Sequence, residues 1–120
     1  MRSLDARAAA LIRIDAVWLA TTPLDMRAGT ETALARVVQV FGGARPHHAY
    51  LFFMRATRMK VLVHDGIGVW LAARRLHQGR FVWPREITLE QMPLTQPQLQ
   101  ALVLGLPWQR VEDDGSIRLL

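Results

Sequence analysis

Apolar residues recur at helical spacing in the first half of the chain. From Glu31 onwards they fall at positions i, i+3, i+4 and i+7 and form one stripe, which consists of Leu34, Val37, Val38 and Phe41. Glu31 itself lies in the first turn, where a negative charge suits the helix dipole. The pair Gly42-Gly43, with Pro46 beyond it, ends the pattern. The spacing therefore predicts a helix over residues 31–41.

A second, shorter helix is predicted near the C-terminal end. Thr95 suits an N-cap, and Pro97 is tolerated in the first turn of a helix. The apolar stripe that follows consists of Leu99, Leu102 and Val103. Gly105 and Pro107 then stop the helix.

The remaining apolar runs are short or alternate with a period of two, which is typical of strands. They predict five strands, over residues 16–21, 48–54, 59–65, 68–76 and 79–84. The third strand has one face made of Met59, Val61 and Val63 and another made of Lys60, Leu62 and His64. Asp65-Gly66 indicates a hairpin between the third and fourth strands. Pro84 ends the fifth strand, because proline cannot donate to a ladder, and the stretch that follows has no regular pattern.

The order of these elements predicts an α+β fold. We expect a small single domain, in which an antiparallel sheet of about four to five strands packs with two helices. The domain is expected to span residues 15–110, between an N-terminal extension over residues 1–14 and an acidic C-terminal tail over residues 111–120. A chain of 120 residues is long enough for one hydrophobic core and too short for two domains.

Composition narrows the class of protein. The chain has no cysteine, which excludes disulfides, thiolate zinc sites and cysteine nucleophiles. No segment approaches the roughly 18 apolar residues of a membrane span, and the N-terminus lacks the apolar core of a signal peptide. We therefore expect a cytoplasmic protein that has no membrane partner.

The charge is concentrated in one part of the chain. The net charge is +5, and Lys60 is the only lysine among 15 basic residues. Residues 54–85 contain a single acid, Asp65, and seven basic residues: Arg55, Arg58, Lys60, Arg74, Arg75, Arg80 and Arg85. Arginine forms forked contacts with phosphate and stacks on bases. A GC-rich coding sequence explains an excess of arginine, but it does not explain this segregation, so we predict that the hairpin region contacts a nucleic acid. The alternative is an ordinary solvated sheet face.

The stretch from Arg74 to Arg85, "RRLHQGRFVWPR", combines arginine with aromatic residues. Side chains alternate between the two faces of a strand. We therefore expect Phe81 or Trp83 to anchor this stretch in the core while the neighbouring arginines stay outside. Gly79 permits the bend between Arg75 and Arg80.

Residues with catalytic chemistry do not converge in the sequence. Serine occurs only near the two ends, at Ser3 and Ser116, which argues against a serine triad. The carboxylates Asp25 and Asp65 occupy different turns, whereas a metal-dependent nuclease needs two or three carboxylates that converge on one cation. The adjacent His47-His48 make a poor metal pair, because neighbours on an extended chain point in opposite directions. We expect no enzyme, no metal site and no cofactor. A nuclease that uses the two aspartates is kept only as a third hypothesis.

Four motifs, taken together, resemble a known family. They are the turn Asp25-Met26-Arg27-Ala28-Gly29, an Arg-x-Lys strand that runs into Asp-Gly-x-Gly over residues 58–68 and includes Asp65 and Gly66, the stretch Arg-Leu-x-x-Gly-x-Phe-x-Trp-Pro over residues 75–84, and the helix start Leu-Thr-x-x-Gln-Leu over residues 94–99. In order and spacing they resemble the TnpB accessory proteins of the IS66 group of bacterial insertion sequences. These proteins are unrelated to the RNA-guided nucleases that share the TnpB name.

The resemblance implies a small protein that is encoded in the element beside a separate DDE-type transposase and has no established catalytic activity of its own. Together with the charge, it suggests that the chain binds the element-end DNA and assists the transposase and other element-encoded proteins. The DNA-binding residues are then expected to be Arg55, Arg58, Lys60, Arg74, Arg75 and Arg80, and the motif residues Asp25, Arg27, Gly29, Asp65, Gly66, Gly79, Phe81 and Trp83 are expected to shape the fold. The alternative is a protein-interaction module that docks on the transposase without touching DNA.

Overall fold

The computed structural model of the chain describes residues 13–82, 84 and 90–111. Along these residues the helices and strands follow one another as β1 (Ala16–Ala20), α2 (Thr30–Phe41), β2 (His48–Arg55), β3 (Arg58–His64), β4 (Val69–Arg75), β5 (Gln91–Leu94), α3 (Gln96–Val103) and the short 3-10 helix η1 (Trp108–Arg110). Most of the predicted N-terminal extension and acidic tail lies outside the described residues, as do Trp83 and Arg85.

The five strands form one mixed sheet with the order β4-β3-β2-β1-β5. β2, β3 and β4 form an antiparallel meander, and β5 pairs with β1 in an antiparallel manner. The predicted α+β class, the strand number and the two helices are therefore confirmed. The prediction of an antiparallel sheet holds for most of the strand pairs but not for β1 and β2, which run parallel. The connection between these two strands contains α2, as a parallel pair requires a long crossover.

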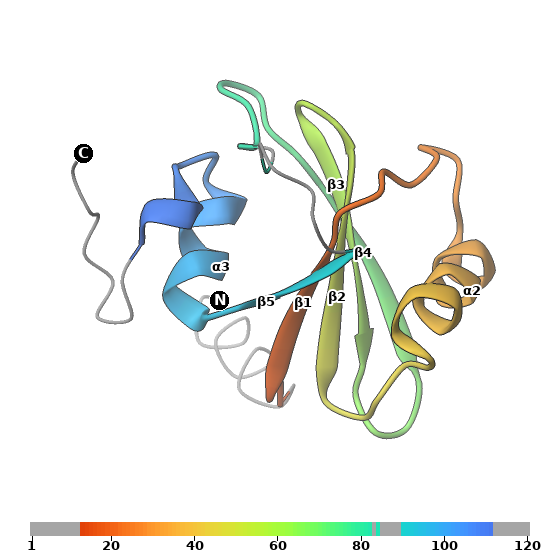
Figure 1. The fold of residues 1–120 in the computed structure, drawn as a ribbon. Helices are drawn as coiled ribbons and strands as arrows, with labels where there is room; N and C mark the ends of the chain where they lie inside the picture. The colour runs from red at the N-terminus through yellow and green to blue at the C-terminus, as the bar shows by residue number, and fades with distance from the viewer. Residues whose placement is uncertain (1–12, 83, 85–89, 112–120) are drawn as a thin grey trace, which may run out of the picture.

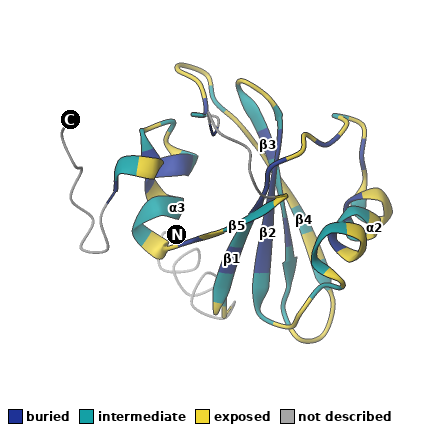
Figure 2. Ribbon diagram, in the orientation of Figure 1, coloured by how far each residue is buried: buried dark blue, intermediate teal, exposed yellow. Residues whose placement is uncertain are grey.

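The sheet is a middle layer with a helix on each side (Figure 1). On the α2 face, Val37 of the helix packs with Tyr50, Phe52 and Leu62 of the sheet. On the α3 face, the fully buried side chains include Trp108, Phe53, Leu51 and Leu102. β1 and β2 are mostly buried and β3 is mostly half-buried, while much of β4 and the outer side of α2 are exposed (Figure 2). Both faces of the sheet therefore contribute to the core.

Both helices begin and end close to the predicted positions. Gly42 ends α2 in the left-handed conformation, with a φ of 83°, and its N–H donates to the Val38 carbonyl. Thr95 is the N-cap of α3: its side chain accepts a hydrogen bond from the N–H of Gln98, and the Gln98 side chain accepts one from the N–H of Thr95. The apolar stripe predicted for α2 is wrong at Val38, which is 52% exposed, because the buried side of the helix is centred on Ala33 and Val37.

The fifth strand lies elsewhere than predicted. The described residues of the expected strand over residues 79–84 form no strand, because Gly79 turns the chain with a φ of 76° and Phe81 N–H instead donates to the Ala56 carbonyl at 2.7 Å. The actual fifth strand is β5, which contains Pro93. A proline is tolerated there because β5 is an edge strand.

Among the described residues, no helix is both long and apolar enough to cross a membrane.

Candidate nucleic-acid interface

Three arginines of neighbouring strands are cross-strand partners at one end of the sheet. Arg55 of β2 is the cross-strand partner of Arg58 of β3, which in turn is the partner of Arg75 of β4. We call these three residues the arginine row. Strands in a sheet lie about 4.8 Å apart, and like charges that oppose each other directly destabilise a sheet. A row of this kind is a candidate binding site for an anion.

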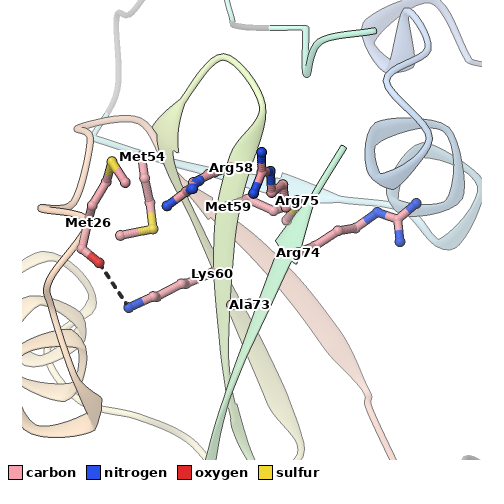
Figure 3. A pocket seen from close by; sticks show the side chains of 8 residues that line it. All are labelled: Met26, Met54, Arg58, Met59, Lys60, Ala73, Arg74 and Arg75. Atoms are coloured by element: carbon pink, nitrogen blue, oxygen red, sulfur yellow. Dashed lines mark hydrogen bonds between the residues drawn. The ribbon is translucent and has the colours of Figure 1, made fainter. Parts of the chain in front are cut away.

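A cavity of about 270 Å³ lies beside the arginine row. Its lining contains two arginines of the row, the lysine of β3 and three methionines; in full it consists of Met26, Met54, Arg58, Met59, Lys60, Ala73, Arg74 and Arg75 (Figure 3). We call it the methionine cavity. None of these lining residues carries a carboxylate, so the described lining of the cavity combines apolar and cationic side chains.

Lys60 joins the cavity to the turn between β1 and α2. Its Nζ donates to the carbonyl of Ala28 at 2.6 Å and to the carbonyl of Met26 at 3.3 Å. The second of these hydrogen bonds is drawn in Figure 3. Two of the three N–H groups of the ammonium are therefore used inside the protein. Lys60 fixes the Asp25–Gly29 turn against the sheet, a contact that the sequence prediction of a DNA-binding lysine did not anticipate.

Arg74 points to the other side of the sheet. Its cross-strand partner is Met59, which belongs to the α3-face core. The Arg74 Nε donates to the carbonyl of Val103, the last residue of α3, at 2.6 Å. A cation at the C-terminal end of a helix compensates unpaired carbonyls and the negative end of the helix dipole. In Figure 3 the Arg74 side chain extends away from Arg58 and Lys60. The Arg74 side chain therefore extends towards α3, although the residue also lines the methionine cavity together with Arg58, Lys60 and Arg75.

A second cavity, of about 410 Å³, adjoins the first through Met54. Its lining consists of Pro23, Met54, Arg55, Ala56, Arg80 and Phe81. Phe81 is 5% exposed and packs against Phe53, with ring centroids 5.8 Å apart, while Arg80 is exposed. The alternation expected for this stretch therefore holds at these two residues. Arg80 is brought beside Arg55, although it is far from it in the sequence.

Asp25 organises the turn that Lys60 holds. Its Oδ1 accepts a hydrogen bond from the Arg27 N–H at 2.8 Å, and its carbonyl accepts one from the Ala28 N–H at 3.0 Å. The Arg27 guanidinium lies 3.7 Å from the same carboxylate, but both side chains are largely exposed, so this ion pair contributes little. Gly29 is the N-cap of α2. These hydrogen bonds hold the Asp25–Gly29 turn in its conformation.

Asp65 organises the hairpin between β3 and β4. Its Oδ1 accepts hydrogen bonds from the N–H groups of Gly68 and Ile67, and its Oδ2 accepts one from the Trp70 indole at 2.7 Å. These hydrogen bonds stabilise the carboxylate and lower the pKa of Asp65 to about 2. Gly66 adopts a φ of 92°, and a Cβ at this position would lie 3.1 Å from the His47 ring. The predicted hairpin is confirmed.

The described residues contain no group of three histidine or acidic side chains able to hold a metal ion. Asp25 and Asp65 lie in separate turns, and each carboxylate accepts hydrogen bonds from its own turn. His48 is also engaged, because its Nδ1 accepts the indole N–H of Trp18 at 3.1 Å.

Sequence reasoning missed the methionines that line the cavity and the exposed Trp70. Met26 occupies the second position of the Asp-Met-Arg turn, and Met54 immediately precedes the first arginine of the row. Their position beside the motif residues was visible in the sequence, but the contact between turn and sheet was not. Trp70 on β4 is 57% exposed.

Comparison with known proteins supports one assignment. The family model described as "IS66 Orf2 like protein" matches residues 15–113. Among curated proteins, the chain is similar to the uncharacterized protein y4hO of Sinorhizobium fredii, with 34% identity over 100 residues, which cover 81% of this chain and 85% of the relative. It is also similar to the uncharacterized protein y4jC of the same organism, with 31% identity over 101 residues, 80% of this chain and 83% of the relative. No solved structure gives a significant match. The matched region contains the Asp25–Gly29 turn, the arginine row and the N-cap of α3, and the chain belongs to the IS66 Orf2-like protein family.

Proposed function

We propose that the chain is a non-catalytic accessory protein of DNA transposition that binds DNA directly through the arginine row. Family membership associates the chain with an insertion sequence and its transposition. The observation that carries the proposal is the pairing of Arg55, Arg58 and Arg75 across three neighbouring strands. Three paired cations repel one another in the free protein, so the phosphates of DNA are natural ligands for them.

Arg80 extends the row at one end. It lines the second cavity together with Arg55. Lys60 contributes positive charge below the row but holds the Asp25–Gly29 turn with two of its N–H groups. The proposed DNA-contacting residues are therefore Arg55, Arg58, Arg75 and Arg80, whereas Lys60 and Arg74 mainly support the fold.

Fluorescence anisotropy with a labelled duplex from an element end, at several salt concentrations, tests this proposal. Each phosphate that the protein neutralises contributes about −0.9 to the slope of log K against log salt. We expect Arg58→Gln to reduce the slope by about one phosphate. Arg74→Gln is the control and is expected to leave the slope unchanged, because the Arg74 guanidinium donates to the Val103 carbonyl of α3. Absent or salt-insensitive binding by the folded wild-type protein contradicts the proposal.

A second candidate function is docking on the transposase, and exposed apolar residues favour it. Ile67 at the hairpin is 98% exposed, Trp70 is 57% exposed and Leu104 at the end of α3 is 60% exposed. Large apolar side chains of this kind mark protein interaction sites when they gather on one surface. A pull-down with the transposase separates the two functions. Docking without DNA contact predicts that Trp70→Ala and Leu104→Ala abolish capture of the transposase and that Arg58→Gln has no effect.

A further inference from the structure

The methionine cavity has features that a site for duplex phosphates alone does not need. Phosphate contacts require cations at the surface, which the arginine row provides. The cavity adds a hollow of about 270 Å³ with the methionines Met26, Met54 and Met59 in its lining, directly beside Arg58 and Arg75. Figure 3 shows Met26 and Met54 on the side to which the Lys60 and Arg58 side chains extend.

The chemistry of this wall suits a flat aromatic ring. Methionine sulfur is polarizable and makes favourable contacts with aromatic rings, and its flexible side chain adapts to their shape. Proteins that hold unpaired nucleotides combine a stacking surface for the base with cations for the backbone phosphate. This cavity combines the same two kinds of group. Met54 precedes Arg55 on β2, and Met26 lies in the turn that Lys60 holds.

The size of the cavity limits its occupant. Sites for drug-sized ligands measure about 300–1,000 Å³, so a cavity of about 270 Å³ is suited to one small ring system. A paired base inside a duplex enters it only if its stacking and pairing are first broken, which costs free energy. A nucleotide that is already unpaired at a DNA end enters without that cost.

We propose that the methionine cavity binds one unpaired nucleobase, so that the protein prefers DNA with an unpaired terminal nucleotide over a fully paired duplex. This inference rests on the proposed function, because the arginine row holds the phosphate next to the base. The Lys60 contacts with the carbonyls of Met26 and Ala28 position the Asp25–Gly29 turn as one wall of the site.

Anisotropy titrations with three labelled ligands test the inference on the wild-type protein. The first ligand is a blunt duplex, the second carries one unpaired thymidine at the 3′ end, and the third carries an abasic nucleotide at the same position. We expect the thymidine extension to bind about tenfold more tightly than both other ligands. The abasic ligand is the matched control, because it keeps the additional phosphate and lacks only the base.

Variants locate the site. Met54→Ala is expected to bring the thymidine ligand to the affinity of the abasic ligand, and Met54→Leu, which keeps an apolar wall of similar volume, is expected to retain part of the preference. Met92→Ala on β5, a methionine packed against the α3-face core, is the control and is expected to retain the full preference. Circular dichroism verifies that each variant is folded.

The outcomes are distinguishable from those of the proposed function. Equal, salt-dependent affinity for all three ligands overturns the inference and leaves direct DNA binding in place. A preference for thymidine that survives Met54→Ala unchanged also overturns it. Absence of salt-dependent binding to every ligand contradicts the proposed function, and the inference fails with it.

Discussion

Arg74 and Arg75 are neighbours in the chain, but they act on opposite sides of the sheet. Both residues line the methionine cavity, but only Arg75 belongs to the arginine row. Arg74 pairs across the sheet with Met59 and donates to the last carbonyl of α3. Two adjacent charges thus serve different purposes: one stabilises the position of a helix, and the other remains available to an anion. A cluster of charge in the sequence is therefore only an upper limit for the charge that a ligand meets.

Removal of the α3-face anchor is expected to have the largest effect. Trp108 is 1% exposed, and its indole Nε1 donates to the Val82 carbonyl at 2.9 Å. Trp108→Ala leaves a cavity and an unpaired carbonyl, and we expect it to lower the free energy of unfolding by about 3–5 kcal/mol. Urea denaturation measures this loss. Val38→Ala on the exposed side of α2 is the control and is expected to stay within about 0.5 kcal/mol. A similar loss in both variants contradicts the assignment of Trp108 to the core.

The role of Lys60 on the α2 face is tested by Lys60→Met, which keeps the length of the side chain. The carbonyls of Met26 and Ala28 lose their donor, and we expect the free energy of unfolding to fall by about 1–3 kcal/mol. Arg36→Met is the matched control. Arg36 also donates to a carbonyl of the segment before α2, that of Pro23, but at 3.4 Å and at the surface. If Lys60→Met retains wild-type stability and only weakens DNA binding, the lysine contacts DNA and does not support the turn.

The contrast between the two neighbouring arginines is tested by a pair of single substitutions. Arg74→Gln is expected to lower the free energy of unfolding by about 0.5–1 kcal/mol, since an exposed hydrogen bond from a charged group is worth only part of a buried one. Arg75→Gln is expected to leave stability unchanged or to raise it by a few tenths of a kcal/mol, roughly the cost of like charges in opposing positions. Urea denaturation and salt-dependent anisotropy are measured on both proteins. An equal reduction of the salt slope in the two variants shows that Arg74 and Arg75 contribute equally to DNA binding and contradicts the contrast between them.

The smallest expected effect is a dependence of stability on pH. It comes from Asp65, which lies at the end of the β3–β4 hairpin that is remote from the arginine row. The pKa of Asp65 is about 2 in the folded protein, whereas an aspartate in an unfolded chain has a pKa of about 3.9. Because the folded pKa is the lower one, the stabilising contribution of Asp65 is complete above about pH 4 and is lost as the pH falls through about 2. Asp65→Asn is expected to reduce this acid dependence of the melting temperature.

Carbon-detected NMR titration of the Asp65 carboxyl group measures the pKa directly. A titration midpoint close to that of an unfolded aspartate contradicts the three hydrogen bonds that the carboxylate accepts.

Local features of the fold could be predicted from the sequence. These features are the N-cap of α3 at Thr95, the C-cap of α2 at Gly42 and the hairpin at Asp65-Gly66. Each depends on residues within a few positions of one another. The stripe of α2 was right at Val37 and wrong at Val38, because spacing alone does not show how far a helix is rotated towards the sheet.

Long-range pairing could not be predicted in the same way. The short β5 contains Pro93, and proline has a low propensity for strands. It is tolerated here because β5 pairs only with β1, at the edge of the sheet. The parallel pairing of β1 with β2 likewise depends on contacts between distant segments. At the site, the sequence showed that positive charge was concentrated, but only the register shows that Arg55, Arg58 and Arg75 are paired. The distinct roles of Lys60 and Arg74 depend on carbonyls that are far away in the chain.

The position of β4 at the outside of the sheet has a consequence for self-association. An edge strand offers unpaired backbone groups to any other strand, and natural proteins discourage such pairing with charged side chains. The opposite edge is β5, which is short and contains a proline. Arg74 and Arg75 at the end of β4 repel a second copy of the same edge, so neutralising both residues is expected to promote aggregation. In the proposed function, the positive charge that attracts DNA therefore also helps to keep copies of the chain apart.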